Sequence, residues 1–213
     1  MFDYILFDLD GTLTDPKEGI TKSVQYALAD FGIEEKNLDK LEVFIGPPLK
    51  ESFIEFYNFN EQDALKAVDK YRERFVVTGI FENKIYEGIP ELLKDLKTAD
   101  YLLAVVSNKA DYAVQILCEQ YFPGMFDLAV GERENVRRKP APDSVNAVLA
   151  EFELKKADAV YIGDSDVDIE TAENVGTDSI LVAWGFRGAD FLREKGAKNI
   201  VFDTEELKRC LLE

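Results

Sequence analysis

The chain has 213 residues, of which 46% are hydrophobic and 31% are charged, so it can bury a sizeable globular core. Its formal net charge of −17 argues against partners such as nucleic acid or anionic membrane, whose binding depends on clustered Lys and Arg. The sequence contains no histidine, which excludes Ser-His-Asp and Cys-His nucleophile pairs, histidine proton relays and histidine metal sites. Any metal site must therefore be built mainly from oxygen ligands.

Two further features bear on location. No run of 18 or more apolar residues is present, and the N-terminus is acidic from Asp3 without the basic segment of a secretory signal. We therefore expect a cytoplasmic protein. Cys118 and Cys210 lie far apart with no CxxC spacing, so we expect both to be buried thiols on helices.

The first predicted element is a strand. Residues 4–7 form an unbroken apolar run that stops at Asp8-Leu9-Asp10-Gly11. Such runs are typical of a parallel strand that is covered on both faces.

The stretch from Pro16 to Tyr86 changes the pattern, because it has no convincing strand. Apolar residues at helical spacing predict two helices there. The first stripe consists of Ile20, Val24, Ala27, Leu28 and Phe31, and the second of Leu65, Val68, Tyr71 and Phe75. We interpret residues 16–86 as an all-helical cap inserted after the first strand, where open α/β sheets bind ligands.

After the cap, strand-like runs alternate with helical patterns. The runs cover residues 102–106, 128–130, 159–162, 180–183 and 200–202. This alternation predicts an α/β fold, a doubly wound parallel sheet with a Rossmann-like core, formed by residues 1–15 and 87–213.

Polar clusters follow several of these strands. They contain Asp8, Asp10 and Thr12, then Ser107 and Asn108, then Lys139, and finally Asp164 and Asp168. Because the carboxyl ends of parallel strands meet at one edge, we expect these groups to converge. Carboxylates packed together cannot all stay ionised without cations, and Lys139 and a divalent metal would relieve their repulsion. Oxygen ligands without His or Cys suit Mg²⁺.

This arrangement suits phosphoryl transfer. Asp8 can attack phosphorus to form an aspartyl phosphate. Asp10 can protonate the leaving alkoxide and later take a proton from water. Ser107 and the amides of a helix starting after Asn108 can hold phosphate oxygens.

Four segments together resemble the motifs of the haloacid dehalogenase-like hydrolase superfamily: residues 7–15 (FDLDGTLTD), 106–109 (VSNK), 138–142 (RKPAP) and 163–168 (GDSDVD). The resemblance implies that Asp8 is the nucleophile and Asp10 the acid/base. It implies that Asp8, Asp164 and the Asp10 backbone carbonyl hold Mg²⁺, and that Asp168 supports either the metal site or Lys139. Phosphate binding is then expected from Thr12, Ser107, Asn108 and Lys139.

Within the superfamily, the sequence is most similar to the phosphoglycolate phosphatase-like branch. Residues 44–49 (FIGPPL) resemble its substrate-facing cap loop, which makes Gly46 and Pro47 candidates for specificity. The same segment also suits a plain helix entry. Arg187 could reach a second anionic group of the substrate or simply lie at the surface.

The predicted function is Mg²⁺-dependent hydrolysis of a small phosphorylated metabolite, such as 2-phosphoglycolate. A nucleotidase or pyrophosphatase is the alternative within the same chemistry. A sugar phosphomutase is disfavoured, since the hexose-phosphate mutases of the superfamily share a cap histidine that is absent here. Asp10 argues against a C–halogen hydrolase, and the full set of site residues argues against a non-catalytic scaffold. Monomer and homodimer both remain open.

Overall fold

The computed structural model describes residues 3–212. The chain forms two compact units, one made of residues 1–14 and 85–213 and the other of residues 15–84. Each unit is described separately below. The predicted division of labour between a catalytic core and a cap stays a prediction.

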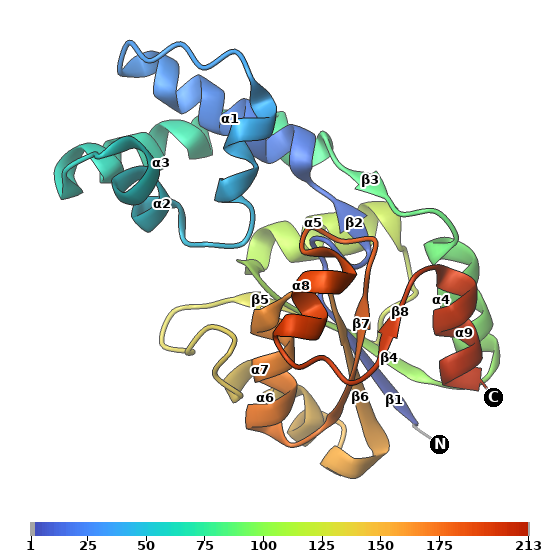
Figure 1. The fold of residues 1–213 in the computed structure, drawn as a ribbon. Helices are drawn as coiled ribbons and strands as arrows, with labels where there is room; N and C mark the ends of the chain where they lie inside the picture. Colours follow the sequence, from blue (N-terminus) through green and yellow to red (C-terminus); the bar gives the residue numbers. More distant parts are fainter. Residues whose placement is uncertain (1–2, 213) are drawn as a thin grey trace. The chain divides into compact units, whose positions relative to one another are not determined.

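The larger unit is built on a six-stranded sheet with the order β5-β4-β1-β6-β7-β8. All neighbouring strands run parallel. The strands are β1 (Tyr4–Phe7), β4 (Leu102–Ala110), β5 (Leu128–Glu132), β6 (Ala159–Gly163), β7 (Asp178–Val182) and β8 (Ile200–Val201). This sheet, together with the helical insertion after β1, confirms the predicted fold class (Figure 1).

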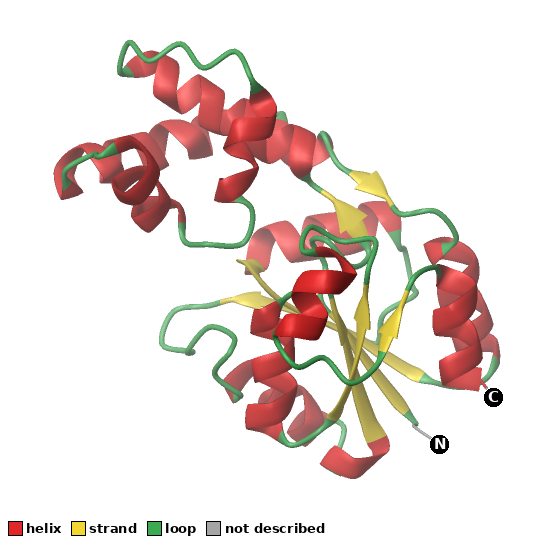
Figure 2. Cartoon of the chain, in the orientation of Figure 1, coloured by secondary structure: helices red, strands yellow, loops and turns green. Residues whose placement is uncertain are grey.

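Helices lie on both sides of this sheet (Figure 2). They are α4 (Ile89–Thr98), α5 (Asp111–Tyr121), α6 (Asp143–Glu151), α7 (Asp166–Val175), α8 (Gly188–Glu194) and α9 (Thr204–Leu212). On one face, Leu6, Val106 and Tyr161 pack with residues of α6 and α7. The alternate residues Ile5 and Phe7 are fully buried as well. Burial of both faces explains why the strand sequences are unbroken apolar runs.

The strand order positions the site. Strand β1 lies between β4 and β6, and Phe7 pairs with Val105 on one side and Ile162 on the other. The residues that follow these three strand segments therefore emerge next to one another at the carboxyl edge of the sheet.

The smaller unit is helical. It contains α1 (Lys17–Asp30), the 3₁₀ helix η1 (Leu38–Phe44), α2 (Leu49–Tyr57), α3 (Glu61–Phe75) and the 3₁₀ helix η2 (Gly79–Phe81). Both predicted stripes fall on helices except for Phe31, which directly follows the end of α1, and Leu65 on α3 is 53% exposed and not part of the core. The buried face of α3 instead follows Ala64, Val68, Tyr71 and Phe75, spaced by four, three and four residues. The prediction chose Leu65 because it is the more hydrophobic residue, whereas its small neighbour Ala64 has the correct helical spacing and is buried.

Two other expectations need correction. The two-residue strand β3 (Lys84–Ile85) lies in the stretch from Pro16 to Tyr86, where no strand is predicted, and it pairs with the equally short β2 (Thr14–Asp15) just before that stretch. Strands this short have no periodicity to detect. Cys118 is buried as expected, but Cys210 is exposed, because the buried face of α9 consists of Leu207 and Leu211.

Between residues 3 and 212, none of the helices combines the length and the apolar character that crossing a membrane requires.

Candidate active site

Asp8 directly follows β1, and its backbone N–H still donates to the carbonyl of Ile162 at 2.8 Å, as in the sheet. Its side chain is only 13% exposed, and its Oδ1 lies 3.0 Å from the Lys139 ammonium as an ion pair. Burial raises the pKa of Asp8 to about 6; Lys139 opposes this rise and the negative charge of Asp168 adds to it. Asp8 is therefore ionised at neutral pH, but the ion pair with Lys139 does not fully compensate the cost of burying its negative charge.

Lys139 provides the positive charge of the site. Its Nζ lies 2.8 Å from Asp168 Oδ1 and donates to the Tyr161 hydroxyl, also at 2.8 Å. Burial alone would lower the pKa of Lys139, but the charges of Asp168 and Asp8 outweigh burial and raise it well above its usual value. Lys139 thus stays protonated although its side chain is only 3% exposed.

Asn108 fixes the backbone of Lys139. Its side-chain amide donates to the carbonyl of Lys139 and accepts from the N–H of Lys139, both at 2.9 Å. This two-point bracket joins the end of β4 to the loop that carries the lysine. A phosphate contact of Asn108 stays a prediction. The contacts that the Asn108 side chain makes in the structure hold the backbone of Lys139 in place.

Tyr161 is a site residue that sequence reasoning assigned only to a strand. Its hydroxyl accepts from Lys139 and donates to the carbonyl of Val106 at 2.7 Å. Tyr161 therefore links the lysine to the strand that precedes Ser107. The available signal was a tyrosine inside an apolar run, since a buried hydroxyl needs a partner.

Asp164 and Asp168 follow β6. Asp168 Oδ2 accepts from the backbone N–H groups of Asp164 and Ser165 and from the Ser165 hydroxyl, at 3.2, 3.1 and 2.7 Å. This is the reciprocal capping of the first turn of α7. Asp164 Oδ2 accepts from the N–H of Phe186 at 2.9 Å. Burial raises the pKa of Asp164 well above its usual value, and the charges of Asp168 and Asp8 raise it further.

Asp8, Asp164 and Asp168 together form a candidate metal centre. One carboxylate oxygen of each lies within 4.8 Å of the others. Three buried carboxylates beside one lysine leave an excess of negative charge that is costly in a low-dielectric site. Asp8 Oδ1 has no hydrogen bond within the part of the chain that the structure describes, although it is ion-paired with Lys139. An all-oxygen set with this charge fits a hard divalent cation.

Two glycines make room for Asp164. A Cβ on Gly185 would lie 2.3 Å from Asp164 Cβ and 2.5 Å from the carbonyl oxygen of Gly11. A Cβ on Gly11 would lie 2.4 Å from Asp164 Oδ2, and Gly11 has a φ of +89°. The backbone thus approaches this carboxylate more closely than a side chain would permit.

We expect Gly185→Ala to weaken divalent-cation binding by about tenfold or more, because Asp164 must move away from the added methyl group, and supporting shells of this kind typically contribute 10–100-fold. Titration of Mn²⁺ by electron paramagnetic resonance would measure the affinity. The control is Gly176→Ala, at the left-handed end of α7 with nothing within 4 Å of the added carbon. That variant should lose about 1 kcal/mol of stability but keep its cation affinity. Equal affinity of both variants would contradict the role of Gly185.

Asp10, Thr12 and Ser107 were predicted around the same strand ends. Asp10 Oδ2 accepts from the Lys109 ammonium at 2.6 Å. Asp10 Oδ1 and the buried Thr12 hydroxyl have no hydrogen-bond partner among the described residues. Ser107 is 6% exposed, and its hydroxyl accepts from the N–H of Lys109 at 3.3 Å. Lys109 belongs to a predicted motif but was given no role.

One expectation about phosphate binding needs correction. Helix α5 begins at Asp111 and not directly after Asn108, because β4 continues to Ala110 with an irregular register beyond Val106. The backbone N–H groups that follow Ser107 therefore belong to an extended segment.

The remaining candidates lie elsewhere. Arg187 Nε is 3.9 Å from Asp166 Oδ1, and its guanidinium lies over the ring of Phe191 at 5.6 Å. With its side chain 40% exposed, Arg187 has the contacts of a surface arginine. Gly46 and Pro47 form the bend before α2 in the smaller unit. A substrate role for these three residues stays a prediction.

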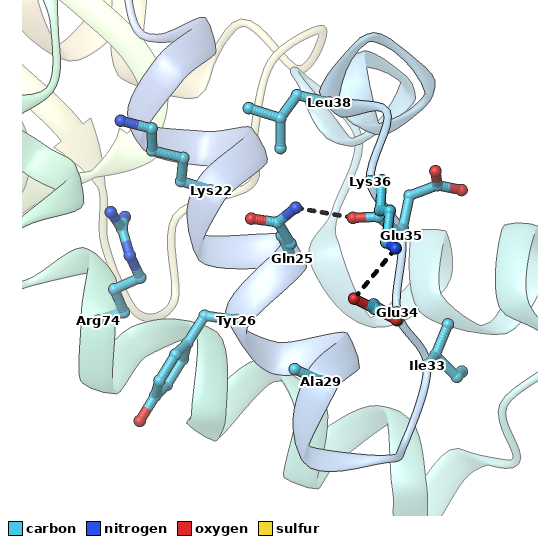
Figure 3. A pocket seen from close by; sticks show the side chains of 10 residues that line it. All are labelled: Lys22, Gln25, Tyr26, Ala29, Ile33, Glu34, Glu35, Lys36, Leu38 and Arg74. Atoms are coloured by element: carbon cyan, nitrogen blue, oxygen red, sulfur yellow. Dashed lines mark hydrogen bonds and ion pairs between the residues drawn. The ribbon is translucent and has the colours of Figure 1, made fainter.

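The smaller unit also contains an open hollow of about 430 Å³ beside α1 (Figure 3). The cationic groups that line it are already paired: Lys22 with Glu18 and Glu82, and Arg74 with Glu82. Lys36, the third, lies 3.6 Å from Glu34. Gln25 donates to the carbonyl of Glu35 across it. Because its charged groups neutralise one another, we assign no ligand to this hollow.

Comparison with known proteins decides the family. The family model of the haloacid dehalogenase-like hydrolases matches residues 5–182. The chain belongs to this family. A 5′-nucleotidase of Pseudomonas aeruginosa is 41% identical over 97% of this chain and 94% of its own length. A phosphoglycolate phosphatase of Aquifex aeolicus is 34% identical over 85% of each chain.

A solved structure agrees. The crystal structure of a predicted phosphatase from Clostridium acetobutylicum has 41% sequence identity and a TM-score of 0.89, covering 100% of this chain and 99% of that one. The fold and the family model thus agree that this chain is a haloacid dehalogenase-like hydrolase.

Proposed function

We propose that this protein is a phosphatase that hydrolyses small phosphate monoesters with Mg²⁺ and through a phosphorylated Asp8. The observation that carries the proposal is the arrangement around Asp8. Its carboxylate lies 3.0 Å from Lys139 and shares one buried cluster with Asp164 and Asp168. A nucleophile, a fixed cation and a candidate metal centre thus meet at one strand end.

In the first step, an oxygen of Asp8 attacks phosphorus and the ester P–O bond breaks. The bond electrons stay on the leaving oxygen, which takes a proton from the Asp10 carboxyl group. Lys139 and Ser107 hold the phosphoryl oxygens. Lys139 needs no further ordering, because Asp168, Tyr161 and Asn108 already fix it. Preorganised charge of this kind is the main source of rate in phosphoryl transfer.

In the second step, the Asp10 carboxylate takes a proton from a water molecule whose oxygen attacks phosphorus. The bond between phosphorus and the Asp8 oxygen breaks, which releases inorganic phosphate and restores Asp8. One residue can serve both steps because the first step leaves Asp10 deprotonated.

Asp8, Asp164 and the backbone carbonyl of Asp10 would hold Mg²⁺, with Asp168 in support. When bound, the cation supplies positive charge to the carboxylate cluster and to the phosphoryl group.

For the substrate, we propose a small metabolite of the phosphoglycolate type, which the Aquifex relative supports. A nucleoside 5′-monophosphate is the alternative candidate, and it has support of its own, because the Pseudomonas relative named a 5′-nucleotidase is 41% identical to this chain, compared with 34% for the Aquifex relative. Both substrates would use the same residues for the chemistry, and only the groups that contact the remainder of the substrate would differ.

The test is a phosphate-release assay over a metabolite panel. The panel contains 2-phosphoglycolate, the nucleoside 5′-monophosphates, pyrophosphate and a hexose 1-phosphate, each with Mg²⁺ and with chelator. We expect release from at least one monoester, and only with Mg²⁺. Conversion of the hexose 1-phosphate to its 6-phosphate would indicate a mutase. No release from any compound would overturn the proposal.

A further inference from the structure

Lys109 forms an ion pair that the proposed chemistry does not yet use. Its Nζ lies 2.6 Å from Asp10 Oδ2, and its side chain is only 8% exposed. A lysine is seldom this buried unless its charge is paired, because desolvating an ammonium group is costly. The side chain of Asp10 is itself only 19% exposed. The contact therefore lies inside the site and not at the surface.

Three consecutive residues near the end of β4, Ser107 to Lys109, make different contacts. The Ser107 hydroxyl accepts from the N–H of Lys109, and the Asn108 side chain bonds both backbone groups of Lys139. Lys109 reaches back to the loop after β1 and contacts Asp10. Asn108 and Lys109 thus contact two different members of the proposed catalytic set, Lys139 and Asp10.

The two carboxylate oxygens of Asp10 differ in their hydrogen bonds. An ammonium group has donors only, so the oxygen that it contacts accepts and cannot also carry the carboxyl proton toward it. Oδ2 is occupied by Lys109, whereas Oδ1 has no hydrogen-bond partner among the described residues. The ammonium contact stabilises the charged oxygen Oδ2, and Oδ1 is the oxygen with no partner to displace, so Oδ1 is the site for the proton that Asp10 exchanges.

We infer that Lys109 is a positioning residue for Asp10, an inference that rests on the proposed function. By holding Oδ2, it fixes the side-chain torsion of Asp10 and presents Oδ1 to the leaving oxygen in the first step and to water in the second. The proton moves from Oδ1 to the ester oxygen as the P–O bond breaks, and from water to Oδ1 as the Asp8–phosphorus bond breaks. Lys109 itself gains and loses no proton.

The test uses two aryl esters that differ in how much they need an acid. Phenyl phosphate releases a basic phenolate, whereas 2,4-dinitrophenyl phosphate releases a stable anion that needs no proton. For Lys109→Met we expect kcat/KM to fall about 10- to 100-fold with phenyl phosphate and less than about threefold with the dinitrophenyl ester, within the range of general acid catalysis. A purely structural role for Lys109 would lower both values equally, and that result would overturn the inference.

A double-mutant cycle with Asp10→Asn tests whether Lys109 acts through Asp10. With phenyl phosphate, adding Lys109→Met to Asp10→Asn should change kcat/KM by less than about twofold, since residues that act as a unit are not additive. Effects that multiply would overturn the inference.

The matched control is Lys208→Met. It also breaks a 2.6 Å lysine–aspartate pair, with Asp95, but on α9 and α4. It should leave the ratio of the two esters unchanged. If Lys109→Met does not fold by circular dichroism, Lys109→Arg gives the same test, because it keeps the charge but moves the donor atoms. An unchanged ratio there would overturn the inference. If the unaltered protein releases no phosphate from any ester, the proposed function fails and this inference with it.

Discussion

Replacing Asp8 by asparagine should lower phosphate release by at least about 10⁴-fold, since a carboxamide cannot form the covalent phosphoenzyme. The substitution keeps the size of the side chain, which lies against Lys139 at the end of β1. Initial rates with the best substrate of the panel would measure the loss. Acid quenching followed by mass spectrometry should find a phosphorylated Asp8 peptide in the unaltered protein and not in the variant.

Stability separates this loss of activity from a loss of fold. Burial raises the pKa of Asp8 to about 6, so the folded protein favours the neutral form of this side chain. Asn is neutral, and the variant should therefore melt no lower than the unaltered protein at neutral pH without metal. The control is Asp190→Asn, a fully exposed residue paired with Arg193 at the surface, where such pairs contribute little. Its activity should be unchanged. Substantial turnover by Asp8→Asn would contradict the covalent mechanism.

The elements and candidate residues could be predicted from sequence because the sheet is parallel and buried on both faces. Asp8, Ser107 and Asp164 each follow an unbroken apolar run, and parallel strands bring such residues to one edge. The order of the strands was not predicted. It depends on which strands pair across long loops, and it determines that β4 and β6 flank β1.

Residues that act within the core were harder to predict. Tyr161 lies inside an apolar strand, and only its hydrogen bonds to Lys139 and Val106 reveal a role. Nothing in the sequence indicates a contact for Lys109, and only the fold shows that its ammonium lies 2.6 Å from Asp10. Both roles depend on contacts between residues far apart in the chain, to which local periodicity is blind.

The errors at Leu65 and Cys210 have a related cause. Each lies next to the true buried stripe of its helix, in α3 and α9 respectively. The prediction relied on the hydrophobic character of single side chains, whereas burial depends on which positions of the helix face the core.

Removing divalent cations should abolish phosphate release and should also destabilise the protein in a pH-dependent way. The candidate ligands Asp8 and Asp164 both have raised pKa values, Asp8 at about 6 compared with its ordinary value of 3.8. Between these two values the metal-free fold binds more protons than the unfolded chain. Its free energy of unfolding must therefore fall as the pH rises through that window.

A bound cation reverses this trend, because it binds the ionised carboxylates and competes with protons. At about 100 times its dissociation constant, Mg²⁺ would add roughly 2.7 kcal/mol, or about 5–10 °C in Tm for a chain of this size. We expect that difference between Mg²⁺ and chelator near pH 7.5, and less than about half of it near pH 5. Differential scanning fluorimetry at both pH values would measure it.

Two variants test whether the Mg²⁺-dependent rise in Tm comes from binding at the buried carboxylates. Asp164→Asn removes one candidate ligand and should lose most of the Mg²⁺-dependent rise in Tm, whereas Asp190→Asn should retain it. A rise that is the same at both pH values would place the cation away from the buried carboxylates. Because the rise is measured without substrate, it tests the metal centre independently of turnover. A protein that shows this pH dependence, but stays inactive with every ester, would have the metal centre of Asp8, Asp164 and Asp168 without the proposed reaction.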